Sequence, residues 1–191
     1  IDTWLRRGAA GFRLDVADEL PDDFIEKIRA AVKRVSPEKF LLGEVWEDAT
    51  TKYGFGQRRT YLLGKGLDSV MNYPFKNAVL DFVKGKPAEQ AMGEILSICE
   101  HYPAPAMDTA LNFLSTHDTE RALTVIADEP ANGRGREWQS GRCVTGEAYE
   151  EGMLRLRMAY AIIYTLPGVP CLYYGDEIGM QGYRDPFNRA F

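Results

Sequence analysis

GFRLDVADELPDDFIEKIRAAVKRVSPEKFLLGEVW, residues 11–46, predicts a strand, an amphipathic helix and a second strand. The apolar run at its start reads as one strand, and "KFLLGEVW" at its end reads as the other. Residues 22–35 place their apolar side chains on one helical stripe, with Asp22 as a plausible cap and Ser36-Pro37 as the stop. Nearly continuous apolar strands that alternate with helices are typical of a parallel sheet, hence of an α/β fold.

The same order of elements continues to the end of the chain. We expect further strands at "DSVMNYPF" (68–75), "ALNFLSTHD" (110–118) and "GVPCLYYG" (168–175), and helices at 75–84, 87–101 and 152–166. Residues 128–151 are rich in glycine and polar residues, which indicates either a plain surface loop or a functional one. In total the chain supplies roughly five strands.

Composition excludes several classes of protein. With 191 residues, of which 45% are apolar, the chain can bury one sizeable core, and its net charge of −5 argues against nonspecific nucleic-acid binding. Three cysteines without C-x-x-C spacing and two histidines favour neither a disulfide framework nor a transition-metal site. The uncharged run 158–175 is interrupted by Pro167, Gly168 and Pro170, so we expect a buried helix and strand there rather than a membrane span.

Polar residues gather where three of the predicted strands end. Arg13 and Asp15 lie on the first strand, two residues apart and so on one face, while Glu44 follows the second and Asp118 the third. Because parallel strands point the same way, their ends converge on one face, and the three carboxylates could share a cleft. For Arg13 and Asp15 alone, a structural ion pair is the simpler interpretation, although buried pairs contribute little to stability.

Two carboxyl groups in different environments are what glycoside hydrolysis requires. Asp15 is expected to stay ionised beside Arg13, which suits a nucleophile. Glu44 precedes apolar Val45 and Trp46, which suits a group that must hold a proton near neutral pH. Trp46 offers a flat apolar face to a sugar ring, or it simply packs in the fold.

At these residues the sequence resembles a known family. "GFRLDVADE", "LLGEVWEDA", "FLSTHDTER", "GVPCLYYGDEIGM" and "DPFNR" are similar, in this order, to conserved regions of the α-amylase family of (β/α)8 TIM-barrel glycoside hydrolases. "DVADE", "GEVWEDA" and "MNYPF" resemble the neopullulanase and cyclomaltodextrinase branch more than animal or fungal amylases. The resemblance implies Asp15 as nucleophile, Glu44 as general acid/base and Asp118 as a third carboxylate that stabilises the transition state. It also implies supporting roles for Arg13 and His117, and donor-side sugar contacts for Asp185 and Arg189.

Two features depart from the family pattern. Asp18 and Glu19 stand where many amylases carry Lys-His, so the usual acceptor-side contacts do not transfer, and Glu19 is the substitute candidate. A complete barrel has eight strands in about 250 residues. Residues 1–191 are therefore expected to form one partial barrel domain, covering about the last five strands, within a longer protein. No cofactor is expected in this segment, the part that precedes it is a candidate for a calcium site, and the compartment stays open between cytoplasm and secretion.

The expected activity is retaining hydrolysis of α-glucosidic bonds, mainly α-1,4, in starch, maltodextrins or related α-glucans. Two alternatives remain open at this point. Transglycosylation would use the same residues with a sugar hydroxyl in place of water, and a silent carbohydrate-binding relative would need no acid/base glutamate. The expected partner is an α-glucan, with no nucleic acid and no membrane. Unpaired apolar strand edges also predict that the isolated chain self-associates.

Overall fold

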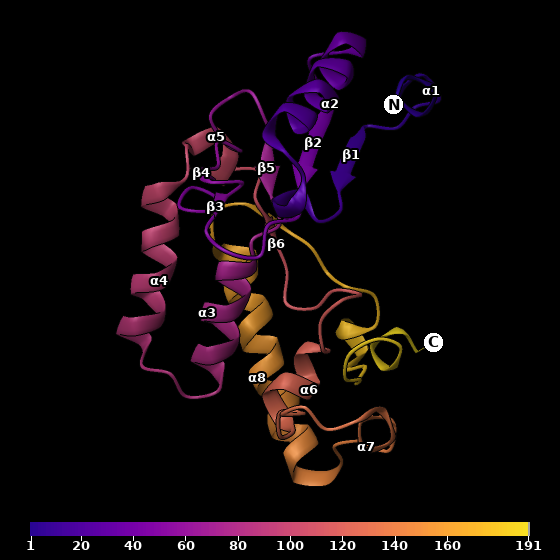
Figure 1. Cartoon of the computed structure of the whole chain (residues 1–191). Coiled ribbons are helices and arrows are strands. Elements are labelled where there is room, and N and C mark those ends of the chain that lie inside the picture. Colours follow the sequence, from indigo (N-terminus) through magenta and orange to yellow (C-terminus); the bar gives the residue numbers. More distant parts are fainter. Residues whose placement is uncertain (191) are drawn as a thin grey trace. The chain divides into compact units, whose positions relative to one another are not determined.

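Parallel strands pair in the structure, a computed structural model that describes residues 1–190. β1 (Gly11–Leu14) pairs in parallel with β2 (Phe40–Gly43), and β2 pairs in parallel with β5 (Ser69–Val70), as Figure 1 shows. Beyond β5, Met71 forms a parallel bridge to Leu111 of β6 (Leu111–Asn112), and β6 pairs with β7 (Val169–Pro170). The parallel α/β arrangement predicted from the sequence is therefore present.

Helix α2 (Asp22–Val35) connects β1 to β2 and has the predicted bounds. Its apolar stripe buries Ile25 and Val32, which are 1% and 0% exposed. The prediction that Asp22 caps this helix is wrong, because Pro21 occupies the N-cap position and Asp22 is the first helical residue. The Asp22 carboxylate instead accepts a hydrogen bond of 2.8 Å from Arg59 Nε.

The later strands are shorter than predicted, for local reasons. Residues 73–75 belong to helix α3 (Tyr73–Val83), because Pro74 suits the first turn of a helix and not the centre of a sheet. β6 stops at Asn112, and hydroxyl bonds between Thr116 and Thr119 hold the following residues in a turn. β7 stops at Pro170, which has no N–H to donate to a strand ladder.

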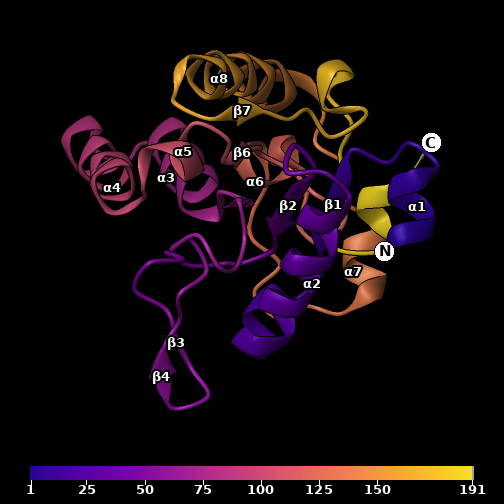
Figure 2. The same ribbon diagram turned by 90° about the horizontal axis from the view of Figure 1, so that it is seen from above.

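Two compact units make up the chain. The first unit comprises Ile1–Pro74, Glu94–Asn112 and Pro167–Val169, and the second comprises Phe75–Gly93, Phe113–Leu166 and Pro170–Phe191. The remaining helices are α1 (Asp2–Arg6), α4 (Ala88–His101), α5 (Ala104–Met107), α6 (Ala122–Ala127), α7 (Arg136–Ser140) and α8 (Gly146–Thr165), with 3-10 turns η1 (Ala17–Glu19), η2 (Asp176–Ile178) and η3 (Phe187–Arg189). In the first unit, β3 (Tyr53–Gly54) and β4 (Gln57–Arg58) form a hairpin that extends away from β1 and β2 (Figure 2).

The prediction that residues 128–151 form a loop is only partly right. That segment contains α7 and the start of α8.

α8 packs against α6 at Gly152, where a Cβ would lie 2.7 Å from Ala127 Cβ and 2.9 Å from Leu123 Cδ1. Glycine is therefore required at this crossing of the two helices. Within residues 1–190, each helix is too short or too polar to cross a lipid bilayer.

Candidate active site

Asp15 lies in the turn that follows β1. The strand ends at Leu14, so the prediction that Asp15 and Val16 belong to the strand is wrong. Val16 has a left-handed backbone with φ of 43°, a conformation that is unusual for a β-branched residue. The turn leaves the Asp15 side chain 72% exposed. Its carboxylate is therefore accessible from solvent, as attack on a substrate would require.

Glu44, by contrast, is buried directly after β2, with its side chain 3% exposed. Its Oε2 accepts a hydrogen bond of 3.0 Å from the Val16 backbone N–H. Its Oε1 accepts one of 3.1 Å from the Tyr73 hydroxyl and lies 2.8 Å from Arg13 Nη2. A buried carboxyl group needs such partners. The contacts fix both carboxyl oxygens, which orients the group.

Arg13 connects the two carboxylates. Its Nη1 contacts Asp15 Oδ1, and its Nη2 forms the ion pair with Glu44. The guanidinium belongs to β1 and its side chain is 27% exposed. One cation thus contacts an exposed carboxylate through one nitrogen and a buried carboxylate through the other. The two carboxyl groups thus lie in different environments, as the sequence predicted. The apolar surroundings expected for Glu44 are wrong, because Arg13, the Val16 N–H and the Tyr73 hydroxyl contact its carboxyl group.

Trp46 lies beside this group and stacks on Tyr73. The ring centroids are 4.6 Å apart and the planes differ by 13°. Trp46 is still 44% exposed. It therefore packs in the fold and also retains apolar surface, which is compatible with both interpretations of this residue.

Glu19, at the end of η1, is exposed. Its neighbour Asp18 forms an ion pair of 3.6 Å with Lys52. Neither the contacts nor the burial of Glu19 distinguishes it as a binding residue.

Tyr73, which binds Glu44 directly, was not among the predicted site residues. The signal available in the sequence was its place in "MNYPF", a stretch interpreted as part of a strand and as a motif of the neopullulanase and cyclomaltodextrinase branch.

The other predicted residues gather in the second unit. His117 Nε2 lies 3.0 Å from Asp118 Oδ2, and Arg189 Nη2 lies 3.8 Å from Asp118 Oδ1. Arg189 Nε also forms an ion pair of 2.9 Å with Asp185. The side chains of His117, Asp118, Asp185 and Arg189 are all at least 35% exposed. These four residues form one accessible charged cluster.

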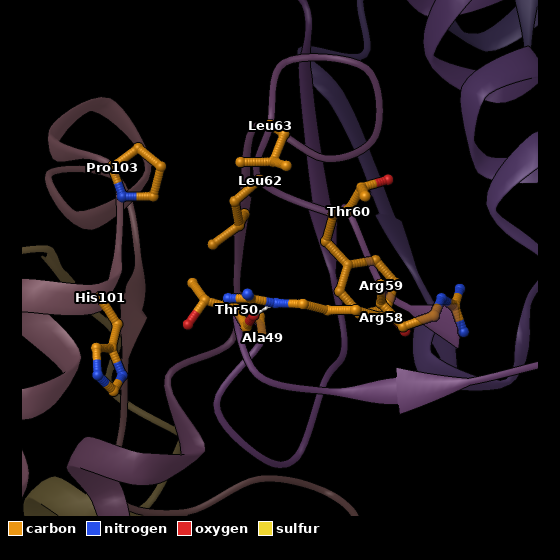
Figure 3. Close-up of a pocket in the computed structure, with 10 residues that line it drawn as sticks. Ala49, Thr50, Arg58, Arg59, Thr60, Leu62, Leu63, His101 and Pro103 are labelled. Atoms are coloured by element: carbon orange, nitrogen blue, oxygen red, sulfur yellow. Dashed lines mark hydrogen bonds between the residues drawn. The ribbon is translucent and has the colours of Figure 1, made fainter. Parts of the chain in front are cut away.

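A cavity of about 320 Å³ lies in the first unit, and Figure 3 shows it. The residues that line it are Ala49, Thr50, Arg58, Arg59, Thr60, Tyr61, Leu62, Leu63, His101 and Pro103, which include neither Asp15 nor Glu44. The Arg59 guanidinium is already occupied by Asp22 and by the backbone oxygens of Asp18 and Leu20. The cavity is therefore not the candidate active site.

The structure holds no arrangement suited to a metal ion in the described part of the chain. Within residues 1–190, no group of three or more histidine, cysteine, aspartate or glutamate side chains could hold one. Side-chain cations contact the carboxylates of the candidate site: Arg13 contacts Asp15 and Glu44, and Arg189 lies 3.8 Å from Asp118.

Comparisons with known proteins show the family of the chain. Residues 1–190 match the family model of the α-amylase catalytic domain. The chain is 37% identical to an amylopullulanase from Thermoanaerobacter thermohydrosulfuricus over 95% of its own length and 12% of that protein. It is 35% identical to neopullulanase 2 from Thermoactinomyces vulgaris over 96% of its own length and 26% of that protein.

Solved structures are also similar to this chain. Cyclic α-maltosyl-(1→6)-maltose hydrolase from Arthrobacter globiformis, in complex with cyclic α-maltosyl-(1→6)-maltose, superimposes with a TM-score of 0.77 at 28% identity, covering 98% of this chain and 36% of that one. The chain thus spans well under half of these relatives. The neighbours have the fold of the α-amylase catalytic domain, a TIM barrel. Since the family model covers nearly every residue, the chain belongs to the α-amylase catalytic-domain family.

Proposed function

We propose that the protein containing this chain hydrolyses α-glucosidic bonds, mainly α-1,4, in starch, maltodextrins or related α-glucans, with retention of configuration. The observation that carries the proposal is the shared contact of Asp15 and Glu44 with Arg13. Retaining enzymes keep their two carboxyl groups about 5 to 5.5 Å apart, whereas inverting enzymes separate them by about 6.5 to 9.5 Å. A common guanidinium favours the shorter separation. The names of the relatives, which include amylopullulanase and neopullulanase 2, support an α-glucan substrate.

The reaction divides into two displacements. In the first, Asp15 attacks the anomeric carbon while Glu44 donates its proton to the glycosidic oxygen, so the leaving sugar departs as an alcohol and a glycosyl ester forms on Asp15. In the second, Glu44 removes a proton from water, the oxygen attacks the anomeric carbon, and the ester bond breaks. Asp15 is then a free carboxylate and Glu44 is protonated again, as at the start.

Asp15 and Glu44 differ in exposure and in their contacts. Asp15 is accessible and beside a cation, so it can reach the sugar. Glu44 is fixed by Val16 and Tyr73, which aims it at one place. Proton transfer depends on such a fixed position within hydrogen-bond reach of the reacting oxygen.

The remaining candidates would bind the sugar. Asp118, supported by His117, would hold sugar hydroxyls and stabilise the positive charge of the transition state. The exposed face of Trp46 would stack on a sugar ring. Asp185 and Arg189 would contact sugars further along the donor side, and Glu19 would serve the acceptor side.

We propose further that residues 1–191 are one part of a longer catalytic barrel. The family fold has eight strands, and the chain spans only 10% to 28% of the curated relatives it matches. The remaining strands, and any calcium site, would lie in other parts of the parent protein.

The test is a comparison of variants in the full-length parent protein. Asp15→Asn should abolish nearly all activity on maltodextrin. Glu44→Gln should lose activity on maltodextrin but keep turnover of α-maltosyl fluoride, whose leaving group needs no protonation. Asp23→Asn is the matched control for Asp15, because its side chain is 71% exposed and pairs with Lys27.

Three results would contradict the proposal. Activity of Asp15→Asn within a few-fold of wild type would remove the assigned nucleophile. Binding of maltodextrin by the wild-type parent without any turnover would make the protein a carbohydrate-binding relative. Products longer than the substrate, formed in preference to hydrolysis at low sugar concentration, would make it a transglycosylase.

A further inference from the structure

The turn that carries His117 and Asp118 is held by one buried side chain of the C-terminal segment. Asn188 Nδ2 donates to the backbone oxygens of His117 at 2.8 Å and Thr119 at 2.7 Å, and lies 3.3 Å from that of Thr116. All of these residues belong to the second unit. The backbone oxygens on both sides of Asp118 are therefore bound by the same amide.

Asn188 cannot itself contact a substrate, because it is 0% exposed. Its Oδ1 is buried and has no hydrogen-bond partner among residues 1–190. A buried unpaired oxygen is unfavourable, so a residue that served only to fill space would be better replaced by an apolar one. The donors of the amide account for the presence of asparagine here.

Arg121 fixes Asn188 in turn. This arginine follows Asp118 by three positions, is 0% exposed, and donates from Nε to the Asn188 backbone oxygen at 2.9 Å. Its Nη1 binds Asp176 Oδ1 at 3.0 Å and also contacts the Tyr174 backbone oxygen. The guanidinium lies 4.2 Å from the Tyr173 ring centroid. Arg121 thus ties the segment that follows Asp118 to the segment that carries Asn188.

These bonds hold the backbone of Asp118 and do not involve its carboxylate, which contacts His117 and Arg189. The backbone around it is bound by Asn188 and, within the turn, by the Thr116 hydroxyl, which accepts from Asp118 N at 3.2 Å. The carboxylate remains 35% exposed. A rigid backbone with an accessible carboxylate is what a preorganised transition-state contact requires.

We infer that Asn188 is a positioning residue, which sets the place of the Asp118 carboxylate through the backbone of residues 116–119. This inference rests on the proposed function, in which Asp118 stabilises the transition state. A displacement of a catalytic group by about 1 Å can reduce the rate by about 100-fold. Loss of Asn188 should therefore reduce kcat and leave substrate binding largely intact.

The experiment uses Asn188→Ala and Asn188→Asp in the full-length parent protein. Aspartate keeps the volume of asparagine and removes both donors. For each variant we expect kcat on maltodextrin to fall about 10- to 100-fold while KM stays within about threefold. Gln181→Ala is the matched control, because Gln181 Nε2 donates to the Val144 backbone oxygen at 2.9 Å from the same C-terminal segment, away from the turn. It should keep kcat within about twofold.

A double-mutant cycle with Asp118→Asn separates positioning from a general effect on the fold. If Asn188 acts through Asp118, its substitution should reduce kcat by less than threefold in the Asp118→Asn background. Additive losses would overturn the inference. So would folded Asn188 variants that keep kcat within twofold of wild type.

The remaining outcomes also support or overturn the inference. If both Asn188 variants fail to fold, Thr119→Val loosens the same turn by removing the hydroxyl that accepts from Thr116 N at 3.0 Å. A reduction of kcat by more than threefold with unchanged KM would support the inference, and an unchanged kcat would overturn it. If Asp118→Asn keeps full activity, the role proposed for Asp118 fails and the inference with it. If Asp118→Asn is inactive but the Asn188 variants are not, only the inference fails.

Discussion

Asp68 joins three elements of the first unit, and its substitution tests how the unit is held together. The carboxylate accepts hydrogen bonds from Arg29 Nη1 at 2.7 Å, Lys33 Nζ at 2.8 Å and the Leu41 backbone N–H at 2.8 Å. Arg29 and Lys33 belong to α2, Leu41 belongs to β2, and Asp68 immediately precedes β5. The Asp68 side chain is 15% exposed. We expect Asp68→Asn to remove the two ion pairs that connect Asp68 to α2.

The magnitude follows from burial and charge. Removing one partner of a buried ion pair costs about 3 to 5 kcal/mol, and a hydrogen bond to a charged group contributes about 1.5 to 3 kcal/mol. Arg29 and Lys33 are 20% and 25% exposed, and asparagine can still accept from Leu41, so both figures are upper bounds here. We therefore expect Asp68→Asn to lower the free energy of unfolding by ~2 to 4 kcal/mol.

The pH dependence of this loss has a definite sign. Burial acts to raise the pKa of Asp68, but the bonds from Lys33, Arg29 and Leu41 outweigh it, so the pKa lies below its ordinary value of 3.8. A group with a lowered pKa stabilises the fold fully above its unfolded pKa and loses that effect as the pH falls through its folded pKa. The difference between wild type and Asp68→Asn should be constant above about pH 5 and shrink below about pH 4.

Urea unfolding of the parent protein, with hydrogen exchange of the amides in β2 and β5 as a local readout, measures both effects. Asp23→Asn is the control, because Asp23 pairs with Lys27 on the same helix but on its exposed side. The control should leave unfolding unchanged. An Asp68→Asn variant within about 0.5 kcal/mol of wild type, or a difference that grows as the pH falls below 4, would refute this reasoning.

Three further predictions address packing, substrate contact and association. Gly11→Ala should disrupt the pairing of β1 with β2, because the new Cβ would lie 1.9 Å from the Phe40 backbone oxygen. Circular dichroism should show a loss of secondary structure in this variant. The control Gly93→Ala should fold normally, because the space around its Cβ is open. Trp46→Ala should raise KM for maltodextrin about threefold to tenfold, and an unchanged KM with lower stability would make Trp46 a packing residue only. The isolated chain, whose Val169 and Leu172 are at least 40% exposed, should self-associate at micromolar concentration and hydrolyse maltodextrin far more slowly than the parent; light scattering that shows a fully active monomer would contradict this.

The sequence predicted the elements with strong periodicity and missed those set by local side-chain bonds. The bounds of α2 were right because its apolar stripe is strong and Ser36-Pro37 ends it. The predicted length of β6 was wrong, because the turn after it depends on hydrogen bonds of the Thr116 and Thr119 hydroxyls, which a periodic pattern of apolar residues does not reveal. The short helix α6 was missed for a similar reason, because it is apolar throughout and has no polar face to mark it.

In the candidate site, too, some residues could be predicted from the sequence and others could not. Arg13, Asp15 and Glu44 could be recognised from residue type and strand position. The contact of Tyr73 with Glu44 could not, because it joins positions 29 residues apart through a helix start that was interpreted as a strand. The role of Asn188 depends on a tertiary contact with a turn about 70 residues earlier. Tertiary contacts of this kind leave no local pattern in the sequence.

The central claim is that Asp15 is the nucleophile of a retaining α-glucan hydrolase, and trapping the glycosyl ester tests it most directly. The parent protein carrying Glu44→Gln would be incubated with 5-fluoro-α-glucosyl fluoride, which forms the ester quickly and loses it slowly, and then digested for mass spectrometry. The account predicts one added fluoroglucosyl group, on the peptide that contains Asp15. A label on a different carboxylate, or no label together with release of the β-anomer by the wild-type enzyme, would contradict it.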